Sequence, residues 1–327
     1  MNNIVLDFSL TKQLTAGPKA REDVNRTLSN HGYKIIKLTF SKASPIKTIF
    51  SLLSIIYRIP FNSNVIVQYP IGTISGSYVV LLLLKLKCCK TTILIHDIES
   101  LRLQQSINRL EKSCLKFGKV IIAHTPNMKN ILTQFINSNK IRILNIFDYY
   151  VDKLPNKTTE FNNTIAFAGN LSKSCFLKKL KYTNLKFNIY GSYNDNLSEF
   201  TSEKIIYKGF FQQEDLSNLE ADWGLVWDGN DIKTCNGNMG EYLKYNAPHK
   251  LSLYIAAQIP VIVWEQSAEK DFVINNGLGI SIDSLENLNN ILQTITEEQY
   301  KTIKTNIRVY SQRIRSGNLL KSTLDIK

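Results

Sequence analysis

Residues 248–265 read PHKLSLYIAAQIPVIVWE and contain one complete structural unit. A helix-length segment, His249–Ala257, ends shortly before Pro260, and the short apolar run Pro260–Val263 follows it. Helices of this length that alternate with short apolar strands indicate a parallel sheet with helices on both faces. We therefore expect an α/β fold.

The same alternation recurs along the chain in two series. Helical segments are expected at Lys19–Asn30, Pro45–Ile56, Ile74–Leu86, Leu103–Phe117, Gln213–Leu219 and Glu297–Leu319. The first series of strands is Asn3–Phe8, Lys34–Leu38, Asn64–Gln68, Thr91–His96, Val120–Ala123 and Ile141–Leu144. The second is Thr164–Ala168, Lys186–Tyr190, Ile205–Lys208, Trp223–Val226, Pro260–Val263 and Gly279–Ile282.

A polar stretch without apolar periodicity, residues 148–163, separates the two series and is the candidate linker. Since 327 residues suit two domains, we expect one at 1–155 and one at 156–327. The final basic helix is expected either to return to the first domain or to form an oligomer contact. Two doubly wound, Rossmann-like sheets of this kind would face a central cleft that holds the ligand.

The charge balance limits the partners. The chain has 40 Lys and Arg against 27 Asp and Glu, a net charge of +13, which suits nucleic acid, an anionic membrane surface or a phosphate-bearing small molecule. The basic residues are spread out, and zinc-finger, RNA-recognition and basic-heptad patterns are absent, so no nucleic-acid partner is expected. A lysine-rich surface that keeps the protein in solution accounts for many of these charges.

Cysteine usage and hydropathy indicate the compartment. Five cysteines without a C-x-x-C pair favour a reducing environment and no structural zinc. The start, MNNIVLDFSL, lacks the layout of a signal peptide. The most apolar run, Val79–Leu84, is much shorter than the roughly 20 apolar residues that a spanning helix needs. We expect a cytoplasmic protein without a transmembrane segment, for which peripheral membrane contact stays open.

Loops that follow strands of the second series carry residues suited to a nucleotide diphosphate. The carboxyl ends of parallel strands share one edge, so these loops can converge on one ligand. Glycines permit close approach, an aromatic ring can cover a base, and a lysine at a helix N-terminus can hold phosphate. Each loop taken alone is more often structural, but together they outline a pocket: Gly169–Ser174, Tyr190–Ser192, Lys208–Phe211 and Asn246–Leu251.

The first series offers two weaker candidates. The small-residue loop Thr15–Pro18 precedes a helix, where backbone N–H groups can meet an anion or a sugar oxygen, although a tight turn explains it equally well. Asp97 follows a strand and is the candidate general base, with helix capping as the even alternative. The adjacent His96 is expected to be a core histidine. No D-x-D pattern occurs, so neither a metal ion nor another cofactor is expected.

The stretch quoted first resembles the donor-domain signature of the GT-B glycosyltransferases, with a Pro-x-Lys that opens a helix and an Ala-x-x-x-Pro-Val turn after it. More narrowly, GLVWDG and GNMGEYLKYNAPHKLSLYIAAQIPVIV are similar to bacterial glucosyltransferases that extend O-linked GlcNAc on serine-rich repeat adhesins, and to related galactofuranosyltransferases. The GNLSKS loop and the His96–Arg102 segment agree, so the resemblance spans almost the whole chain.

The resemblance implies a GT-B fold, a UDP-sugar donor and metal-independent hexosyl transfer. The register puts Leu253 where many relatives place a ribose-binding glutamate, and the Glu-x7-Glu pair is absent, so another group must hold the ribose. The donor would be held by Thr15, Gly17, Asn170, Lys173, Tyr190, Gly191, Phe210, Asn246, Pro248, His249 and Lys250.

Three functions stay open. The favoured one is transfer of a hexose, glucose or GlcNAc, to a GlcNAc-modified Ser or Thr of a serine-rich repeat adhesin. The second is galactofuranosyl or hexosyl transfer to a lipid-linked or polysaccharide acceptor. The third, of another class, is a non-catalytic nucleotide-sugar-binding or scaffolding subunit. The adhesin-modifying relatives also suggest a homo-oligomer, specifically a tetramer.

Overall fold

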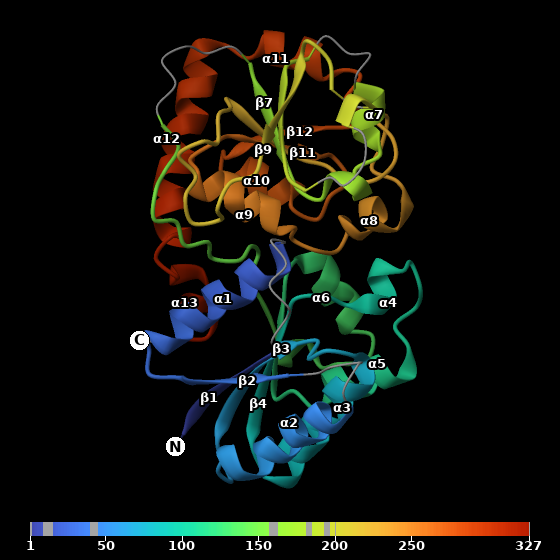
Figure 1. Cartoon of the computed structure of the whole chain (residues 1–327), viewed down its shortest axis with the longest axis vertical. Coiled ribbons are helices and arrows are strands. Elements are labelled where there is room, and N and C mark those ends of the chain that lie inside the picture. The colour runs from blue at the N-terminus through green and yellow to red at the C-terminus, as the bar shows by residue number, and fades with distance from the viewer. Residues whose placement is uncertain are drawn as a thin grey trace. The chain divides into compact units, whose positions relative to one another are not determined.

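The computed structural model describes residues 2–8, 16–39, 45–156, 163–180, 185–192, 197–199 and 201–326. The chain divides into two compact units (Figure 1). The N-terminal unit comprises Met1–Asn145 and Leu320–Lys327, and the C-terminal unit comprises Ile146–Leu319. The chain therefore passes between the units twice.

The N-terminal unit is built on a parallel six-stranded sheet of order β2-β1-β3-β4-β5-β6. Its strands are β1 (Asn3–Phe8), β2 (Lys34–Leu38), β3 (Asn64–Tyr69), β4 (Lys90–Ile95), β5 (Val120–Ala123) and β6 (Ile141–Ile143). Its helices are α1 (Ala16–Ser29), α2 (Pro45–Arg58), α3 (Ile74–Leu86), α4 (Glu99–Arg102), α5 (Arg109–Lys116) and α6 (Pro126–Leu132). Buried runs of Ile, Val and Leu in the central strands explain this sheet, because a strand covered on both faces is apolar along its whole length.

The C-terminal unit contains a second parallel sheet, of order β12-β11-β10-β7-β8-β9. Its strands are β7 (Ile165–Ala168), β8 (Phe187–Tyr190), β9 (Ile205–Gly209), β10 (Trp223–Val226), β11 (Val261–Trp264) and β12 (Gly279–Ile282). Its helices are α7 (Phe176–Leu180), α8 (Gly237–Tyr242), α9 (His249–Ala256), α10 (Lys270–Asn275), α11 (Leu288–Thr294) and α12 (Glu297–Ile314), while α13 (Asn318–Thr323) spans the second passage between the units. The core of this unit is rich in aromatic side chains, including Phe167, Trp223 and Trp264.

The structure confirms the predicted α/β class, and all twelve predicted strands are present. One predicted helix begins later than expected, and another is absent. The segment 103–117 becomes helical only at Arg109, because the Asn108 side chain accepts a hydrogen bond from Glu111 N and caps the helix there. Residues Gln213–Leu219 form turns, since Asp215 is engaged in a bridge with Lys153. Within the described residues, no helix is both long and apolar enough to cross a membrane.

Candidate functional site

The strand order of the C-terminal sheet reverses between β7 and β10. These neighbours pair over only two residues each, ending at Ala166 of β7. Beyond that point the Tyr254 hydroxyl of α9 replaces the ladder: it accepts a hydrogen bond from Ala168 N (2.7 Å) and donates one to Ala166 O (3.1 Å). Ligands of open α/β sheets bind outside the carboxyl ends of the strands at such a reversal, so this edge is the first place to look for a site.

Lys250, in the first turn of α9, lies at this reversal. Its Nζ donates to Trp227 O and to Asp228 Oδ1, both at 2.9 Å and both just after β10. It also lies 4.8 Å from the centroid of the Phe167 ring on β7. The side chain is only 13% exposed. The positive end of a helix dipole disfavours a buried cation, and Asp228 offsets this in part. A bound anion would neutralise the remaining positive charge of Lys250 and the helix N-terminus, so this position is suited to a phosphate.

Glycines join the loops after β7, β8 and β9. Gly169 N donates to Tyr190 O and Gly191 N donates to Gly209 O, each at 3.0 Å. Gly191 has φ +143°, and a Cβ there would lie 1.9 Å from Gly169 O, so no other residue fits without a shift of the backbone. The predicted convergence of these loops on one edge of the sheet is therefore present in the fold.

Unpartnered buried polar groups lie in two neighbouring loops of this unit, the one before α9 and the one after β11. Ala268 N donates to Leu243 O (2.9 Å) and ties the loops together. Asn246 Oδ1 and both Glu269 carboxylate oxygens are buried and have no hydrogen-bond partner among the described residues. Burial raises the pKa of Glu269 well above its ordinary value. Buried polar atoms normally have partners, so these acceptor oxygens are suited to a ligand with hydroxyl donors.

Sequence reasoning missed Glu269 and Asp228. Both follow strands whose carboxyl ends lie at the candidate edge, and that position is the signal that could have found them. Leu253, which the resemblance places where many relatives have a ribose-binding glutamate, is buried. Glu269 is thus the acidic side chain in this region with unused acceptor capacity.

The predicted aromatic residues differ in exposure. Tyr190 is 2% exposed, and its ring packs edge-on against Phe211 with centroids 5.4 Å apart. Its hydroxyl donates to Asn218 O (3.2 Å) and accepts from Glu220 N (2.9 Å), while burial raises its pKa to about 12. Phe210, in contrast, is 45% exposed at the end of β9. Because the Phe210 ring is not part of the core, it can cover a base, whereas the Tyr190 ring is already packed inside the unit.

The remaining predicted residues of this unit lie around the same edge. Asn170 is the N-cap of the short 3-10 helix Leu171–Lys173 after β7, Lys173 is its last residue, and both side chains are exposed. Pro248 is the N-cap of α9. The His249 ring packs against Tyr149, with centroids 4.9 Å apart.

In the N-terminal unit, the candidates lie near the carboxyl ends of β1 and β4. Thr15 is outside the described residues, and Gly17 lies in the first turn of α1. The Asp97 side chain is 42% exposed and 3.9 Å from Arg102 Nη1. The N-cap of α4 is Ile98, so Asp97 is not that cap. A half-exposed carboxylate after a strand is compatible with the predicted role of a base, which stays a prediction.

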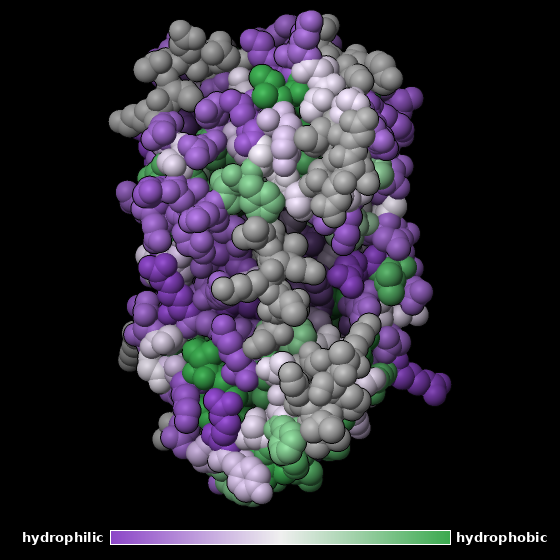
Figure 2. All heavy atoms as spheres, in the orientation of Figure 1, coloured by the Kyte–Doolittle hydropathy of each residue, from purple (hydrophilic) through white to green (hydrophobic). Residues whose placement is uncertain are grey.

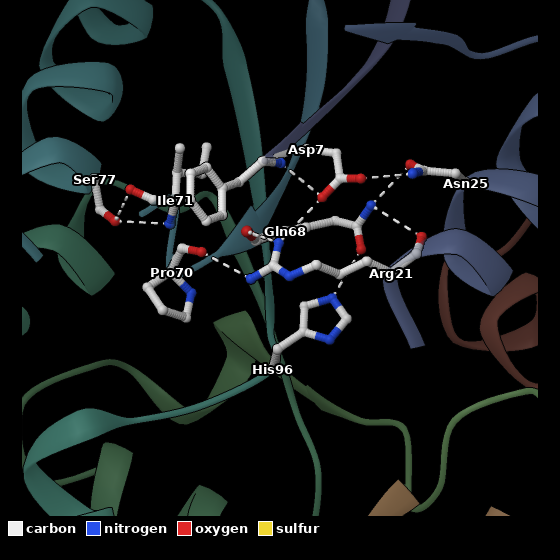
Figure 3. Close-up of polar contacts among 9 residues, drawn as sticks. Asp7, Arg21, Asn25, Gln68, Pro70, Ile71, Ser77 and His96 are labelled. Atoms are coloured by element: carbon white, nitrogen blue, oxygen red, sulfur yellow. Dashed lines mark hydrogen bonds and ion pairs between the residues drawn. The ribbon is translucent and has the colours of Figure 1, made fainter. Parts of the chain in front are cut away.

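A buried polar network lies beside His96 (Figure 3). Arg21 of α1 donates to Asp7 Oδ1 (3.2 Å), Gln68 O (2.9 Å) and Pro70 O (2.8 Å). Burial lowers the pKa of Arg21, and Asp7 opposes that shift. The network lies at β1 and β3, the neighbours between which this sheet reverses its strand order.

The same network determines which ring nitrogen of His96 carries a proton. Asp7 Oδ2 can only accept, so Asn25 Nδ2 donates to it at 2.7 Å. Asn25 Oδ1 then accepts from Gln68 Nε2 (2.8 Å), and Gln68 Oε1 is left to accept from His96 Nε2 (2.8 Å). His96 therefore has its proton on Nε2, which makes Nδ1 the hydrogen-bond acceptor of the neutral ring. Sequence analysis assigned His96 to the core and did not anticipate this.

No group of three or more His, Cys, Asp or Glu residues within the described ranges is placed to hold a metal ion.

Solved structures share this architecture. HepE of Anabaena, solved with UDP and glucose, aligns over 100% of both chains with a TM-score of 0.63 and 12% identity. Sucrose-phosphate synthase of Thermosynechococcus elongatus aligns over 100% of this chain and 97% of its own, with a TM-score of 0.66 and 12% identity. The lipopolysaccharide outer core galactosyltransferase WaaB gives 0.62 at 11% identity, with 99% of both chains covered. The fold is therefore GT-B, which confirms the predicted architecture.

Sequence comparison is more specific. Residues 2–146 match the N-terminal domain and residues 165–326 the C-terminal domain of the family described as glucosyltransferase 3-like. The chain is 34% identical to the β-1,6-galactofuranosyltransferase WbbI of Escherichia coli over 71% of this chain and 69% of the relative. It is 27% identical to glucosyltransferase 3 of Streptococcus parasanguinis over 72% and 68%. The chain belongs to the glucosyltransferase 3-like family and is a glycosyltransferase.

Proposed function

We propose that the chain transfers a hexose from a UDP-sugar, bound at the carboxyl edge of the C-terminal sheet. The observation that carries this proposal is the enclosed Lys250–Asp228 pair, held at the strand-order reversal and at the N-terminus of α9. A diphosphate bound there would gain a nearly desolvated cation and the helix dipole together.

The donor site that we propose keeps the residues identified from sequence. Lys250 and the exposed Lys173 neutralise the diphosphate, and Phe210 with the close-packed Gly191 lines the base. The other contributors in the C-terminal unit are Asn170, Tyr190, Asn246, Pro248 and His249.

We assign Glu269 to the ribose. A vicinal diol offers two O–H donors, and both carboxylate oxygens of Glu269 are buried without a partner among the described residues. This assignment supplies the group that Leu253 cannot provide.

For the transfer step, Asp97 is the proposed base that removes the proton of the acceptor hydroxyl. We expect turnover without a metal ion, because Lys250, Lys173 and the N-terminus of α9 supply positive charge to the leaving diphosphate. Undiminished turnover in the presence of a chelator would support this, and loss restored by Mg²⁺ or Mn²⁺ would contradict it.

The order of sequence identities among the relatives supports one choice of hexose and acceptor. The 34% identity to a galactofuranosyltransferase exceeds the 27% and 26% identity to the two glucosyltransferase 3 proteins. We therefore propose galactofuranose as the first donor sugar, with a lipid-linked or polysaccharide acceptor, on the cytoplasmic side of the membrane. This order reverses the one that the sequence alone favoured.

The second candidate is transfer of glucose or GlcNAc to a GlcNAc-modified Ser or Thr of a serine-rich repeat adhesin. The similarity to glucosyltransferase 3 of Streptococcus parasanguinis and Streptococcus gordonii supports it. A tetrameric assembly belongs to the same candidate.

A donor and acceptor panel separates these candidates. The purified chain is incubated with UDP-galactofuranose, UDP-galactopyranose, UDP-glucose or UDP-GlcNAc, and with either a lipid-linked glycan or a GlcNAc-modified serine-rich peptide. UDP release and product mass are recorded. Transfer to the lipid-linked glycan from UDP-galactofuranose alone supports the first candidate, and transfer to the peptide supports the second.

A non-catalytic subunit would bind UDP and release none from any donor. Lys250→Met should weaken UDP binding by roughly 10- to 100-fold, whereas the matched control Lys153→Met should leave it unchanged. Lys153 also pairs with an aspartate, Asp215 (2.7 Å), but its side chain is 69% exposed. Equal loss in both variants would mean that the Lys250 site is not where UDP binds.

A further inference from the structure

Exposed apolar side chains in the N-terminal unit are concentrated on two neighbouring helices, α2 and α3, which are in contact. Of the fifteen large apolar side chains exposed among the described residues, eight lie on these helices or just after α2. Six of them define what we call the α2–α3 face: Phe50 (67%), Leu53 (43%) and Tyr57 (86%) on α2, and Val79 (40%), Leu82 (37%) and Leu86 (66%) on α3. Figure 2 shows apolar residues gathered over these helices.

The spacing of these residues makes the face continuous. On each helix they follow one another at intervals of three or four, which places them along a single side. Lys87 Nζ links the helices by donating to Ile56 O at 2.8 Å. In the C-terminal unit, by contrast, the exposed apolar residues are dispersed over separate elements, for example Ile206 on β9 and Val309 on α12. Scattered residues need no explanation, whereas a contiguous patch indicates a binding surface.

The charged residues around the α2–α3 face are positive. Between Asp23 and Asp97 the sequence contains nine Lys and Arg and no Asp or Glu. Three of these cations are exposed at the ends of α2, α3 and the adjoining strand β4, respectively: Arg58, Lys85 and Lys90. Helix α5, which contacts α3, has one acidic residue, Glu111, and its carboxylate is buried and accepts from Glu99 N and Ser100 N. No anion of these helices therefore offsets the cations at the surface.

We propose that the α2–α3 face binds the surface of an anionic lipid membrane, with its apolar side chains inserted at the headgroup boundary and the flanking cations on the lipid phosphates. An amphipathic surface of this composition is suited to the membrane interface. A second copy of the chain is a poorer occupant, because a two-fold interface would bring the same cations against one another. Binding of this kind brings the enzyme to an acceptor carried by lipid, but does not depend on transferase activity.

Vesicle flotation of the whole chain, without donor or acceptor, tests the proposal. We expect binding to phosphatidylcholine vesicles that contain phosphatidylglycerol, little binding to phosphatidylcholine alone, and loss of binding at high salt. The charge variant Arg58→Gln/Lys85→Gln/Lys90→Gln should bind about 100-fold more weakly, since each such cation contributes roughly a fivefold factor. The apolar variant Phe50→Ser/Leu53→Ser/Tyr57→Ser should lose about tenfold or more.

Matched substitutions in the C-terminal unit serve as controls. Ile206→Ser/Val309→Ser and Lys186→Gln/Lys233→Gln/Arg308→Gln change exposed residues of the same kinds and should leave vesicle binding unchanged. Circular dichroism and thermal unfolding establish that every variant is folded. Equal binding to neutral and anionic vesicles would overturn the proposal. Absence of binding of the unmodified chain to anionic vesicles would also overturn it, and a change of oligomeric state in the apolar variant would then make the face an interface between copies.

Discussion

The buried carboxyl of Glu269 makes the stability of this protein depend on pH in a direction opposite to that of an ordinary acidic side chain. Burial raises its pKa well above the usual value, so it is protonated in the folded chain at pH values where the unfolded chain has lost the proton. The unfolded state then binds fewer protons, and stability falls as pH rises. The stabilising contribution is complete below the unfolded pKa and is lost progressively as pH rises toward the folded pKa.

The variant Glu269→Gln is neutral at every pH and should remove this dependence. While the folded side chain keeps its proton, the wild type should lose about 1.4 kcal/mol of unfolding free energy per pH unit relative to the variant. For a domain of roughly 150–250 residues this corresponds to about 3 to 6 °C in Tm per pH unit. Thermal unfolding of both proteins between about pH 5.5 and 7.5 measures the difference, with the exposed Glu286→Gln as control.

The same variant tests the ribose assignment. Replacing one carboxyl oxygen by an amide nitrogen should weaken UDP binding about tenfold or more, because that position can then no longer accept a hydrogen bond from a ribose hydroxyl, even though the free protein becomes more stable near neutral pH. Titration calorimetry with UDP provides the measurement. If the Tm values of the two proteins change with pH in the same way, Glu269 is ionised in the folded chain and the reasoning is refuted. If UDP affinity is unchanged, Glu269 does not contact the ribose.

Four further perturbations address other parts of the site. Gly191→Ala should cost more than about 2 kcal/mol in denaturant unfolding, because it combines φ +143° with a Cβ that lies 1.9 Å from a backbone oxygen, and an unchanged midpoint would exclude that strain. Lys250→Met should reduce UDP affinity by roughly 10- to 100-fold in calorimetry, and an affinity equal to wild type would remove it from the diphosphate site. Asp97→Asn should lower kcat by about 10²- to 10⁴-fold with UDP affinity intact, whereas a loss of affinity alone would deny it the role of base. Gln68→Met should abolish the Nε2-protonated preference of His96 in ¹⁵N NMR spectra of the ring, and an unaltered tautomer would show that the amide chain does not control it.

The strands could be predicted because a parallel strand covered on both faces is an unbroken apolar run, and such runs are visible without any tertiary information. The failures come from interactions between distant residues. Gln213–Leu219 has the composition of a helix, yet Lys153 engages Asp215 from the preceding segment and turns form instead. For residues 103–117, the cap at Asn108 determines where the helix begins, and the apolar pattern alone does not reveal it.

Site residues could be predicted from the sequence where their position after a strand or at the start of a helix determines their role. They could not be predicted where the role depends on the surroundings of the side chain in the folded unit. Gly191 and Lys250 follow strand ends or open a helix, and both lie at the sheet edge that this position implies. Other acidic residues, such as Glu111 and Asp7, are as deeply buried as Glu269. Glu269 differs in that both of its carboxyl oxygens have no hydrogen-bond partner among the described residues, which has no signature in the chain. Tyr190 shows the reverse case. A tyrosine at the end of a strand suits a base-binding site, yet its hydroxyl is already engaged with Asn218 O and Glu220 N.

The return of residues Leu320–Lys327 to the N-terminal unit has a consequence for synthesis on the ribosome. Arg142 of that unit donates to Thr323 O and pairs with Asp325, both at 2.7 Å. The ribosome releases these partners only after the entire C-terminal unit has been translated. The half of the protein that is made first is therefore completed last, and until then its Arg142 lacks the two groups that hold it in the finished fold.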